Sequence, residues 1–200
     1  MIRSPQQRAN SLLKRSGIAH SGDLERAGLS RSQIQHLLGA RLIERVERGI
    51  YRLPDAPLTE HHDLALVARQ APGGVVCLLS ALRFHGLTTQ NPFEVWLAID
   101  HKAWRPMLEH PPLRLVYVSG PALREGVEEH DVGGVRVRVY GAAKTVADCF
   151  KFRNKIDTDV AVEALREYRR RFPKRLEAVW RCAQVDRVAR VMAPYLAAMG

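Results

Sequence analysis

Apolar residues recur at helical spacing in three short stretches near the start of the chain. Each stretch, at 4–17, 21–28 and 30–40, opens at a serine that can cap a helix. The first two end at a glycine, and the second carries carboxylates in its first turn, where the helix dipole favours them. We therefore expect three helices, with a short extended segment at 18–20 between the first two.

Two β-prone runs follow the third predicted helix. They occupy 42–46 and 50–54 and flank the sequence Glu47-Arg48-Gly49, which favours a hairpin whose second strand is closed by Pro54. The order of helix, helix, glycine turn, helix and hairpin is that of a winged helix-turn-helix. The sequence thus predicts a DNA-binding domain over residues 1–54.

The remaining residues, 55–200, are predicted to form a second domain of mixed helices and strands. We expect elements at 59–70 (helix), 75–78 (strand), 80–86 (helix), and 94–99, 114–118 and 135–140 (strands). Gly133 and Gly134 favour a hairpin into the last of these strands. From Ala142 onward the pattern is helical, with breaks expected at Pro173 and Pro194. The predicted fold class is α+β, a winged helix-turn-helix followed by a mixed α/β domain with a C-terminal helical layer.

Positive charge is concentrated at both ends of the chain. The 31 Lys and Arg outnumber the 21 Asp and Glu, for a formal net charge of +10. Residues 1–54 hold ten basic and four acidic side chains, 55–140 hold eight and ten, and 141–200 hold thirteen and seven. Such an excess favours a polyanionic partner, with nucleic acid favoured over an anionic membrane.

The three cysteines indicate neither a zinc site nor a disulfide framework. Cys77, Cys149 and Cys182 are far apart, form no CxxC pair and lie in apolar surroundings, as buried free thiols do. The start of the chain lacks an apolar signal core, and no apolar run approaches the length of a membrane span. We expect a cytoplasmic protein without a metal or cofactor.

The polar face of the third helix and the hairpin arginines are the candidate DNA contacts. Opposite the stripe of Ile34, Leu37 and Leu38, the helix carries side chains suited to base edges, and the hairpin carries cations suited to phosphates or the minor groove. The candidates are Arg31, Ser32, Gln33, Gln35, His36, Arg45, Arg48 and Arg52. The alternatives are a solvated polar helix beside a solvated hairpin, or a module that binds proteins.

Signals for catalysis are weaker. Neighbouring helical positions in His61-His62-Asp63 point about 100° apart and cannot hold one ion together. Asp100-His101-Lys102 matches the D-x-K half of a metal-dependent nuclease site, but no convincing second carboxylate accompanies it. There is no phosphate loop, no GxSxG and no cysteine with a plausible His and acid partner. We predict that the chain is not an enzyme, with a metal-dependent nuclease as the alternative, and that Trp96 and Trp104 serve packing.

Three segments resemble the AbiEi-type antitoxins of type IV toxin–antitoxin systems, which act in abortive infection, a form of phage defence. They are the hairpin at 44–54, the stretch 79–88, and 139–155, which reads VYGAAKTVADCFKFRNK and is the most distinctive. The resemblance extends from about Gly17 to Arg170. It implies an antitoxin and transcriptional autorepressor that binds inverted repeats in its own operator, with self-association on double-stranded DNA. It also implies that the α+β domain at 55–200 counters a nucleotidyltransferase-like toxin, directly or indirectly.

A second basic cluster lies within the most distinctive of these segments. It consists of Lys144, Lys151, Arg153 and Lys155. The cluster is either a second basic surface for DNA or toxin, or part of a helix that begins at Lys144-Thr145 and buries Val146, Cys149 and Phe150. A plain transcription factor without a toxin, whose C-terminal domain senses a ligand, remains an alternative for the whole chain.

Overall fold

The chain folds into two compact units that mix helices and strands. The computed structural model describes residues 4–55, 61–108 and 110–198. One unit comprises 1–69 together with 131–136, and the other comprises 70–130 and 137–200. The predicted α+β class is confirmed. No helix of the described residues combines the length and the apolar character that a bilayer span requires.

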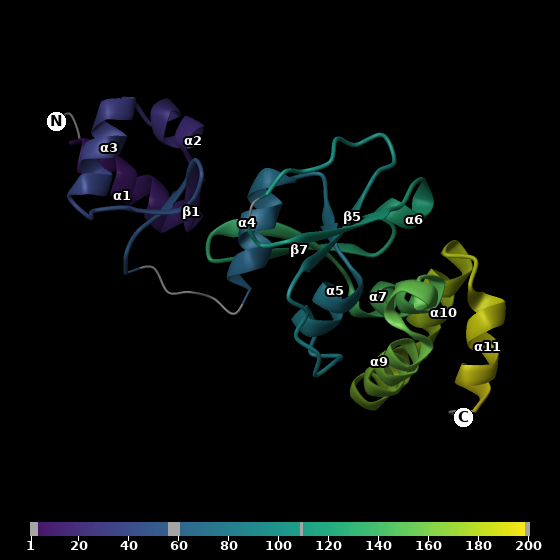
Figure 1. Cartoon of the computed structure of the whole chain (residues 1–200). Coiled ribbons are helices and arrows are strands. Elements are labelled where there is room, and N and C mark those ends of the chain that lie inside the picture. The colour runs from purple at the N-terminus through teal and green to yellow at the C-terminus, as the bar shows by residue number, and fades with distance from the viewer. Residues whose placement is uncertain (1–3, 56–60, 109, 199–200) are drawn as a thin grey trace. The chain divides into compact units, whose positions relative to one another are not determined.

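The first unit contains three short helices and a small sheet (Figure 1). Its elements up to residue 55 are α1 (Pro5–Ser16), β1 (Ile18–His20), α2 (Ser21–Arg26), α3 (Arg31–Gly39), β2 (Glu44–Glu47) and β3 (Ile50–Arg52). The three strands are antiparallel in the order β1-β3-β2, so the segment that follows α1 pairs with the hairpin. Helix α4 (His62–Gln70) follows. Its predicted start at Thr59 lies outside the described residues.

Two of the helices in this unit begin with a reciprocal capping box. In α1 the Ser4 hydroxyl accepts a hydrogen bond from the backbone N–H of Gln7, while the Gln7 side chain accepts one from the Ser4 N–H. Ser30 and Gln33 do the same at α3, so donors that a helix start leaves unpaired are satisfied. Ser21 is the first residue of α2 and not its cap. The cap is His20, whose backbone N–H donates a hydrogen bond to the Asp23 carboxylate.

The core of this unit gathers apolar side chains from all three helices and the sheet. Its buried members are Ala9, Leu13, Ala19, Leu24, Leu29, Ile34, Leu37, Ile43 and Tyr51. The predicted inward stripe of α3 is confirmed at Ile34 and Leu37, whereas Leu38 is only partly buried. The orientation of α3 about its own axis is therefore fixed by two side chains in the core.

The second unit is built on a mixed five-stranded sheet. Its strands are β4 (Val75–Val76), β5 (Val95–Ile99), β6 (Leu113–Tyr117), β7 (Val127–Val132) and β8 (Val135–Tyr140), in the order β6-β5-β4-β8-β7. The ends of β7 and β8 at their connecting turn, residues 131–136, are grouped with the first unit. The pairs β5–β6 and β4–β8 are parallel, and β4–β5 is antiparallel. The predicted hairpin through Gly133 and Gly134 is confirmed, since it joins β7 to β8.

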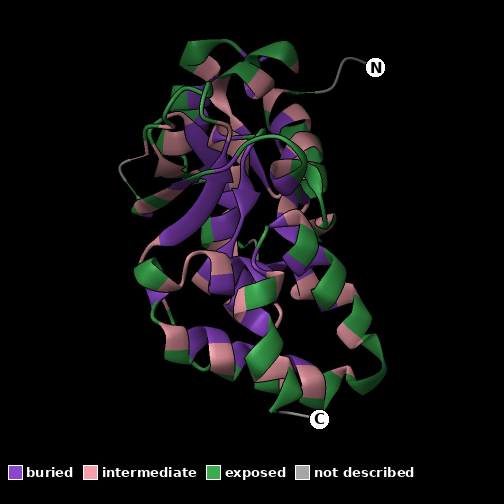
Figure 2. Ribbon diagram, turned by 90° about the vertical axis from the view of Figure 1, so that its right-hand side faces the viewer, coloured by how far each residue is buried: buried purple, intermediate pink, exposed green. Residues whose placement is uncertain are grey.

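Helices supply the rest of the second unit. They are α5 (Leu78–Phe84), α6 (Pro121–Arg124), α7 (Ala142–Lys151), α8 (Arg153–Ile156), α9 (Thr158–Arg171), the 3-10 turn η1 (Pro173–Arg175), α10 (Leu176–Val185) and α11 (Ala189–Ala197). Helix α7 packs against α5, α9 and α10 and is buried along most of its length. The central strands are buried, whereas the C-terminal helices alternate buried and exposed faces (Figure 2).

Three details of the second unit differ from the sequence-based expectation. The strand at 75–78 is only Val75–Val76, because α5 begins at Leu78, whose φ of 44° turns the chain out of the strand. Pro194 lies inside α11 instead of ending it, and the buried Met192 anchors that helix in the core. Trp96 is buried as predicted, but Trp104 is 95% exposed and does not serve packing.

The glycine turn of the β7–β8 hairpin generates a first prediction. Gly134 has a φ of +81°, and a Cβ there would lie 2.7 Å from the Arg15 carbonyl oxygen and 2.8 Å from the Gly17 nitrogen. We expect Gly134→Ala to lower the free energy of unfolding by about 1–3 kcal/mol, because the left-handed backbone and the contact both oppose a side chain. The measurement is denaturant unfolding. Gly73→Ala is the matched control, since no atom lies within 4 Å of a Cβ there, and equal losses in the two variants would contradict the prediction.

Candidate nucleic-acid interface

Helix α3 presents one polar, exposed stripe. Ser32, Gln35, His36 and Gly39 are exposed and recur at the spacing of a single helix face. The buried residues Ile34 and Leu37 hold the opposite face in the core. The stripe therefore offers a hydroxyl, an amide and an imidazole side by side, all of which can donate and accept hydrogen bonds.

The predicted contact Gln33 is engaged in the fold. Its Oε1 accepts a hydrogen bond of 2.9 Å from the Ser30 N–H, as part of the capping box at the start of α3. The side chain is only partly exposed. In this conformation Gln33 stabilises the helix start, and its amide oxygen is not available to a base edge.

Two further predicted contacts lie at the first turn of α3. The Arg31 side chain is 91% exposed and lies 3.0 Å from a Glu25 carboxylate oxygen. At such exposure the ion pair contributes little and can exchange for a phosphate at small cost. The Ser32 hydroxyl lies 2.9 Å from the Ser30 hydroxyl.

The hairpin of β2 and β3 carries the remaining candidates. Arg45 is exposed, and its guanidinium carbon lies 5.8 Å from the ring centroid of Tyr51, which orients the arginine. Arg48 is exposed in the turn, beside Gly49 with a φ of +77°. The Gly49 carbonyl accepts a 2.8 Å hydrogen bond from the Ser21 N–H, so the hairpin turn is tied to the start of α2.

Arg52 differs from the other hairpin arginines because it already has a carboxylate partner. Its Nε and one terminal nitrogen donate to the same Glu44 oxygen at 3.0 and 2.9 Å, across the two strands. Its side chain is only 18% exposed. Arg52 therefore braces the hairpin, and Arg45 and Arg48 are the two predicted hairpin cations that stand exposed.

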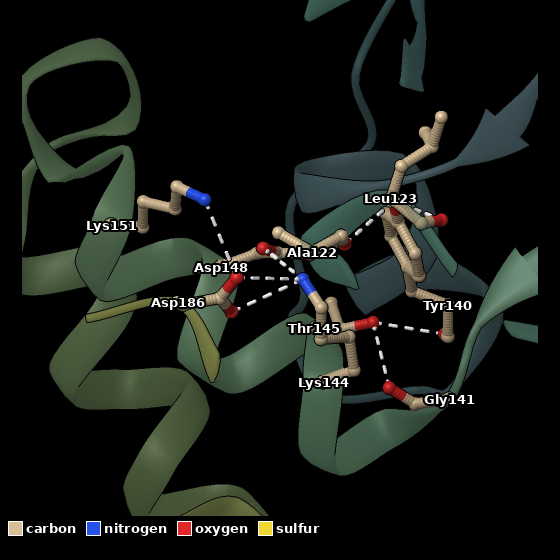
Figure 3. A network of polar contacts seen from close by, with 9 residues as sticks. All are labelled: Ala122, Leu123, Tyr140, Gly141, Lys144, Thr145, Asp148, Lys151 and Asp186. Atoms are coloured by element: carbon tan, nitrogen blue, oxygen red, sulfur yellow. Dashed lines mark hydrogen bonds and ion pairs between the residues drawn. The ribbon is translucent and has the colours of Figure 1, made fainter. Parts of the chain in front are cut away.

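The predicted second basic surface is wrong at Lys144, which is buried. Its side chain is 1% exposed, and its Nζ lies 2.5 Å from an Asp148 oxygen and 3.1 Å from an Asp186 oxygen (Figure 3). The same Nζ lies 4.5 Å from the ring centroid of Tyr140. Lys144 thus pairs α7 with the residue that follows α10, as the alternative of a structural helix implied, and Val146, Cys149 and Phe150 are in the core.

The charges of this buried network shift one another's ionisation. Burial lowers the pKa of Lys144, but the two nearby carboxylates and their hydrogen bonds outweigh it, so the pKa lies above its ordinary value. Burial raises the pKa of Asp148, and Asp186 adds to the effect while Lys144 opposes it. The raised pKa keeps the Lys144 ammonium charged beside its two carboxylates near neutral pH.

The other members of the predicted basic cluster lie around this network. Lys151 is 28% exposed and lies 3.4 Å from Asp186, and Arg153 donates to the Phe150 carbonyl at 2.9 Å. Lys155 is exposed, with its Nζ 5.7 Å from the Phe152 ring centroid. The spacing of four residues between Lys144 and Asp148 is typical of an ion pair on one helix face, so the sequence could have predicted this contact. Nothing local in the sequence pointed to Asp186.

The candidate catalytic motifs are not assembled into a site. Asp100 accepts a 2.9 Å hydrogen bond from the Lys102 backbone N–H, so the carboxylate stabilises a turn. Among the described residues, no three His, Cys, Asp or Glu side chains are placed to hold a metal ion. Burial raises the pKa of all three cysteine thiols, to about 11 for Cys182, which opposes thiolate formation.

Comparison with known proteins supports the resemblance in the N-terminal part. Residues 7–54 match the family described as "Transcriptional regulator, AbiEi antitoxin". No curated protein sequence matches the chain. A crystal structure of the RV2827C protein from Mycobacterium tuberculosis superposes with a TM-score of 0.51 at 14% identity, covering 93% of this chain and 77% of that one. At this identity the likeness concerns the fold alone.

The buried network generates a second prediction. Lys144→Met should lower the free energy of unfolding by about 3–5 kcal/mol, because it leaves Asp148 and Asp186 buried without their shared cation. Loss of the Lys144 charge, which lowers the pKa of Asp148, raises that already elevated pKa further, so the folded variant binds a proton more readily and regains stability as pH falls. Denaturant unfolding should show a smaller deficit at about pH 5 than at about pH 7.5.

Lys151→Met is the matched control for this variant. Its side chain is partly exposed and reaches the same Asp186, and we expect a loss of no more than about 1 kcal/mol. An equal loss in the two variants, or a deficit in Lys144→Met that does not change with pH, would contradict the prediction.

Proposed function

We propose that the chain is an antitoxin and autorepressor whose N-terminal part, the segment that matches the AbiEi regulator family, is a winged helix-turn-helix. The three helices and the antiparallel β2–β3 hairpin have the order that this motif requires. The single observation that carries the proposal is the exposed stripe of Ser32, Gln35 and His36 on a helix whose start is capped and whose other face is buried.

The stripe suits direct readout of a duplex. Recognition helices of this class contact base edges from their N-terminal turns, and amide side chains pair with adenine through two hydrogen bonds. Arg45 and Arg48 on the hairpin supply the charge that phosphates or the minor groove would meet. We assign Arg31, Ser32, Gln35 and His36 to the operator and Gln33 and Arg52 to holding these elements in shape.

The antitoxin role is proposed from the description of the family that residues 7–54 match, and we assign it to residues 55–200. We propose that they counter a nucleotidyltransferase-like toxin, directly or indirectly, and that the chain acts in the cytoplasm. Inverted-repeat operators need two recognition helices, and one chain supplies one, so two copies would occupy an operator. The second unit has its own core around α7 and can carry a function separate from DNA reading.

The third prediction separates base reading from helix capping. Gln35→Ala should weaken specific binding to the operator by about 1–3 kcal/mol while leaving unfolding and non-specific DNA binding almost unchanged. Gln33→Ala should instead lower the free energy of unfolding by about 0.5–1 kcal/mol through loss of half the capping box. The measurements are titration of the native promoter and of scrambled DNA, with unfolding curves in parallel.

Arg48→Ala is the control for the electrostatic part of binding. It should weaken binding to both DNA sequences and reduce the salt slope by about one unit, as loss of one phosphate contact does. Native affinity in Gln35→Ala together with an unchanged slope in Arg48→Ala would place both elements off the DNA.

The fourth prediction concerns the antitoxin role. The full chain, co-expressed with a nucleotidyltransferase-like toxin of the proposed kind, should restore growth, and Gln35→Ala should still do so while a promoter reporter is derepressed. This separation is expected because Gln35 lies on a face that we assign to DNA alone. The proposal fails if the wild-type chain does not relieve toxicity, or if rescue and repression are lost together in that variant.

A further inference from the structure

The first unit contains a cleft of about 900 Å³ beside the C-terminal end of α3. Its walls come from α1, the segment after α3, the end of β3, α4 and the turn between β7 and β8, all of which belong to that unit. Pockets for organic ligands span roughly 300–1,000 Å³ and are mostly apolar with a few polar groups. The cleft has the size of a small-molecule site and takes no part in the proposed base reading.

The floor of the cleft is apolar. Leu13 of α1 is 2% exposed, and Leu42 and Leu53 are partly buried members of the same core. Val132 and Val135, which flank the hairpin turn, are buried and also line the cleft. An organic ring or chain would gain free energy by covering these groups, because this removes apolar surface from water.

The rim of the cleft carries two exposed cations, Lys14 and Arg41. Lys14 on α1 and Arg41 after α3 both line the cleft, and in the described part of the chain neither forms an ion pair. The third cation at the rim, Arg52, is neutralised by Glu44. Among the lining residues that the structure describes, Asp55 is the single carboxylate, so this described part of the rim carries a net positive charge. This combination of an apolar floor and a cationic rim selects an amphipathic anion.

The position of Arg41 connects the cleft to the DNA-reading helix. Arg41 has a φ of 55°, a conformation that costs free energy for a side chain other than glycine. Its backbone N–H donates to the Leu38 carbonyl at 3.0 Å, and that of Leu42 donates to the Leu37 carbonyl at 2.9 Å, so both close the end of α3. A ligand that contacts Arg41 and Leu42 would therefore affect the position of the end of α3. Through Leu53 it would also affect β3, the strand that follows the hairpin turn.

We propose that this cleft is an effector site for a small amphipathic organic anion, whose binding changes the affinity of α3 for operator DNA. The inference that the anion binds depends on the cleft alone, whereas its effect on the affinity for DNA rests on the proposed function. A ligand shifts DNA affinity only by its differential affinity for the DNA-bound and free forms, so the two effects are reciprocal.

The probe is 1-anilinonaphthalene-8-sulfonate, an aromatic sulfonate whose fluorescence rises in apolar surroundings. The full-length protein should bind it saturably, and the Lys14→Gln, Arg41→Gln double variant should bind it about tenfold more weakly, which corresponds to 1.4 kcal/mol. The neutral analogue N-phenyl-1-naphthylamine should bind wild type and the double variant alike, because it lacks the group that the cations contact.

Two controls separate the cleft from other surfaces. Lys174→Gln, Arg175→Gln removes two exposed cations of the second unit and should leave sulfonate binding unchanged. Trp104→Ser, Met107→Ser removes the most exposed apolar side chains and should also leave it unchanged. The proposal is overturned if the rim variant binds the sulfonate as wild type does, or if either control variant loses as much affinity as the rim variant.

A promoter titration with and without saturating sulfonate gives the second readout. We expect the apparent Kd for operator DNA to change at least threefold in wild type and to remain constant in the rim variant at the same sulfonate concentration. Saturable binding without an effect on operator affinity would overturn the regulatory role while leaving the site. Absence of operator binding under any condition would refute the proposed function, and the fluorescence titration would still decide the cleft.

Discussion

The face that α3 offers to a partner is set by two side chains that it cannot expose. Ile34 and Leu37 are buried among residues from α1, α2 and the strands, and turning the helix would bring polar groups into that core. The capping box at Ser30 and Gln33 fixes the start of the helix, and the hydrogen bonds after Ala40 fix its end. Because both ends and one face of α3 are held in place, the polar stripe is already oriented in the unbound protein. This reduces the conformational entropy lost when a partner binds.

The second unit depends on a different constraint, the buried ammonium of Lys144, which is shared by two carboxylates. Lys144 lies on the most buried helix of the unit, and its two aspartates come from the same helix and from the end of α10. Replacing such a group by an apolar side chain can be neutral for stability only when its partners are replaced too. The residue types at Lys144, Asp148 and Asp186 therefore depend on one another, although Lys144 and Asp186 are 42 residues apart in sequence.

Local patterns predicted most elements of the fold, and the failures have identifiable causes. Serine caps and glycine stops located α1 and α3, and the paired glycines located the β7–β8 turn, because these signals act within a few residues. For Lys144 the sequence left a basic surface and a structural helix as alternatives, and local pattern could not decide between them because its burial involves Asp186, a long-range partner. Gln33 and Arg52 have the chemistry of DNA contacts, but neighbouring residues in the fold engage them. The Ser30-x-x-Gln33 spacing of a capping box could have indicated the role of Gln33, whereas residue type alone carries no record of the pairing of Arg52 with Glu44. The assignment of the remaining contacts to DNA stays a prediction.

The first unit is discontinuous along the chain, since it needs the turn at 131–136 as well as the first 69 residues. A ribosome delivers the chain from its N-terminus, and domains that are contiguous can fold as soon as they emerge. Here the short helices and the hairpin emerge early, but the turn that is grouped with them is made only after residue 130. The first unit can therefore reach its final packing only once the chain has been synthesised as far as residue 136.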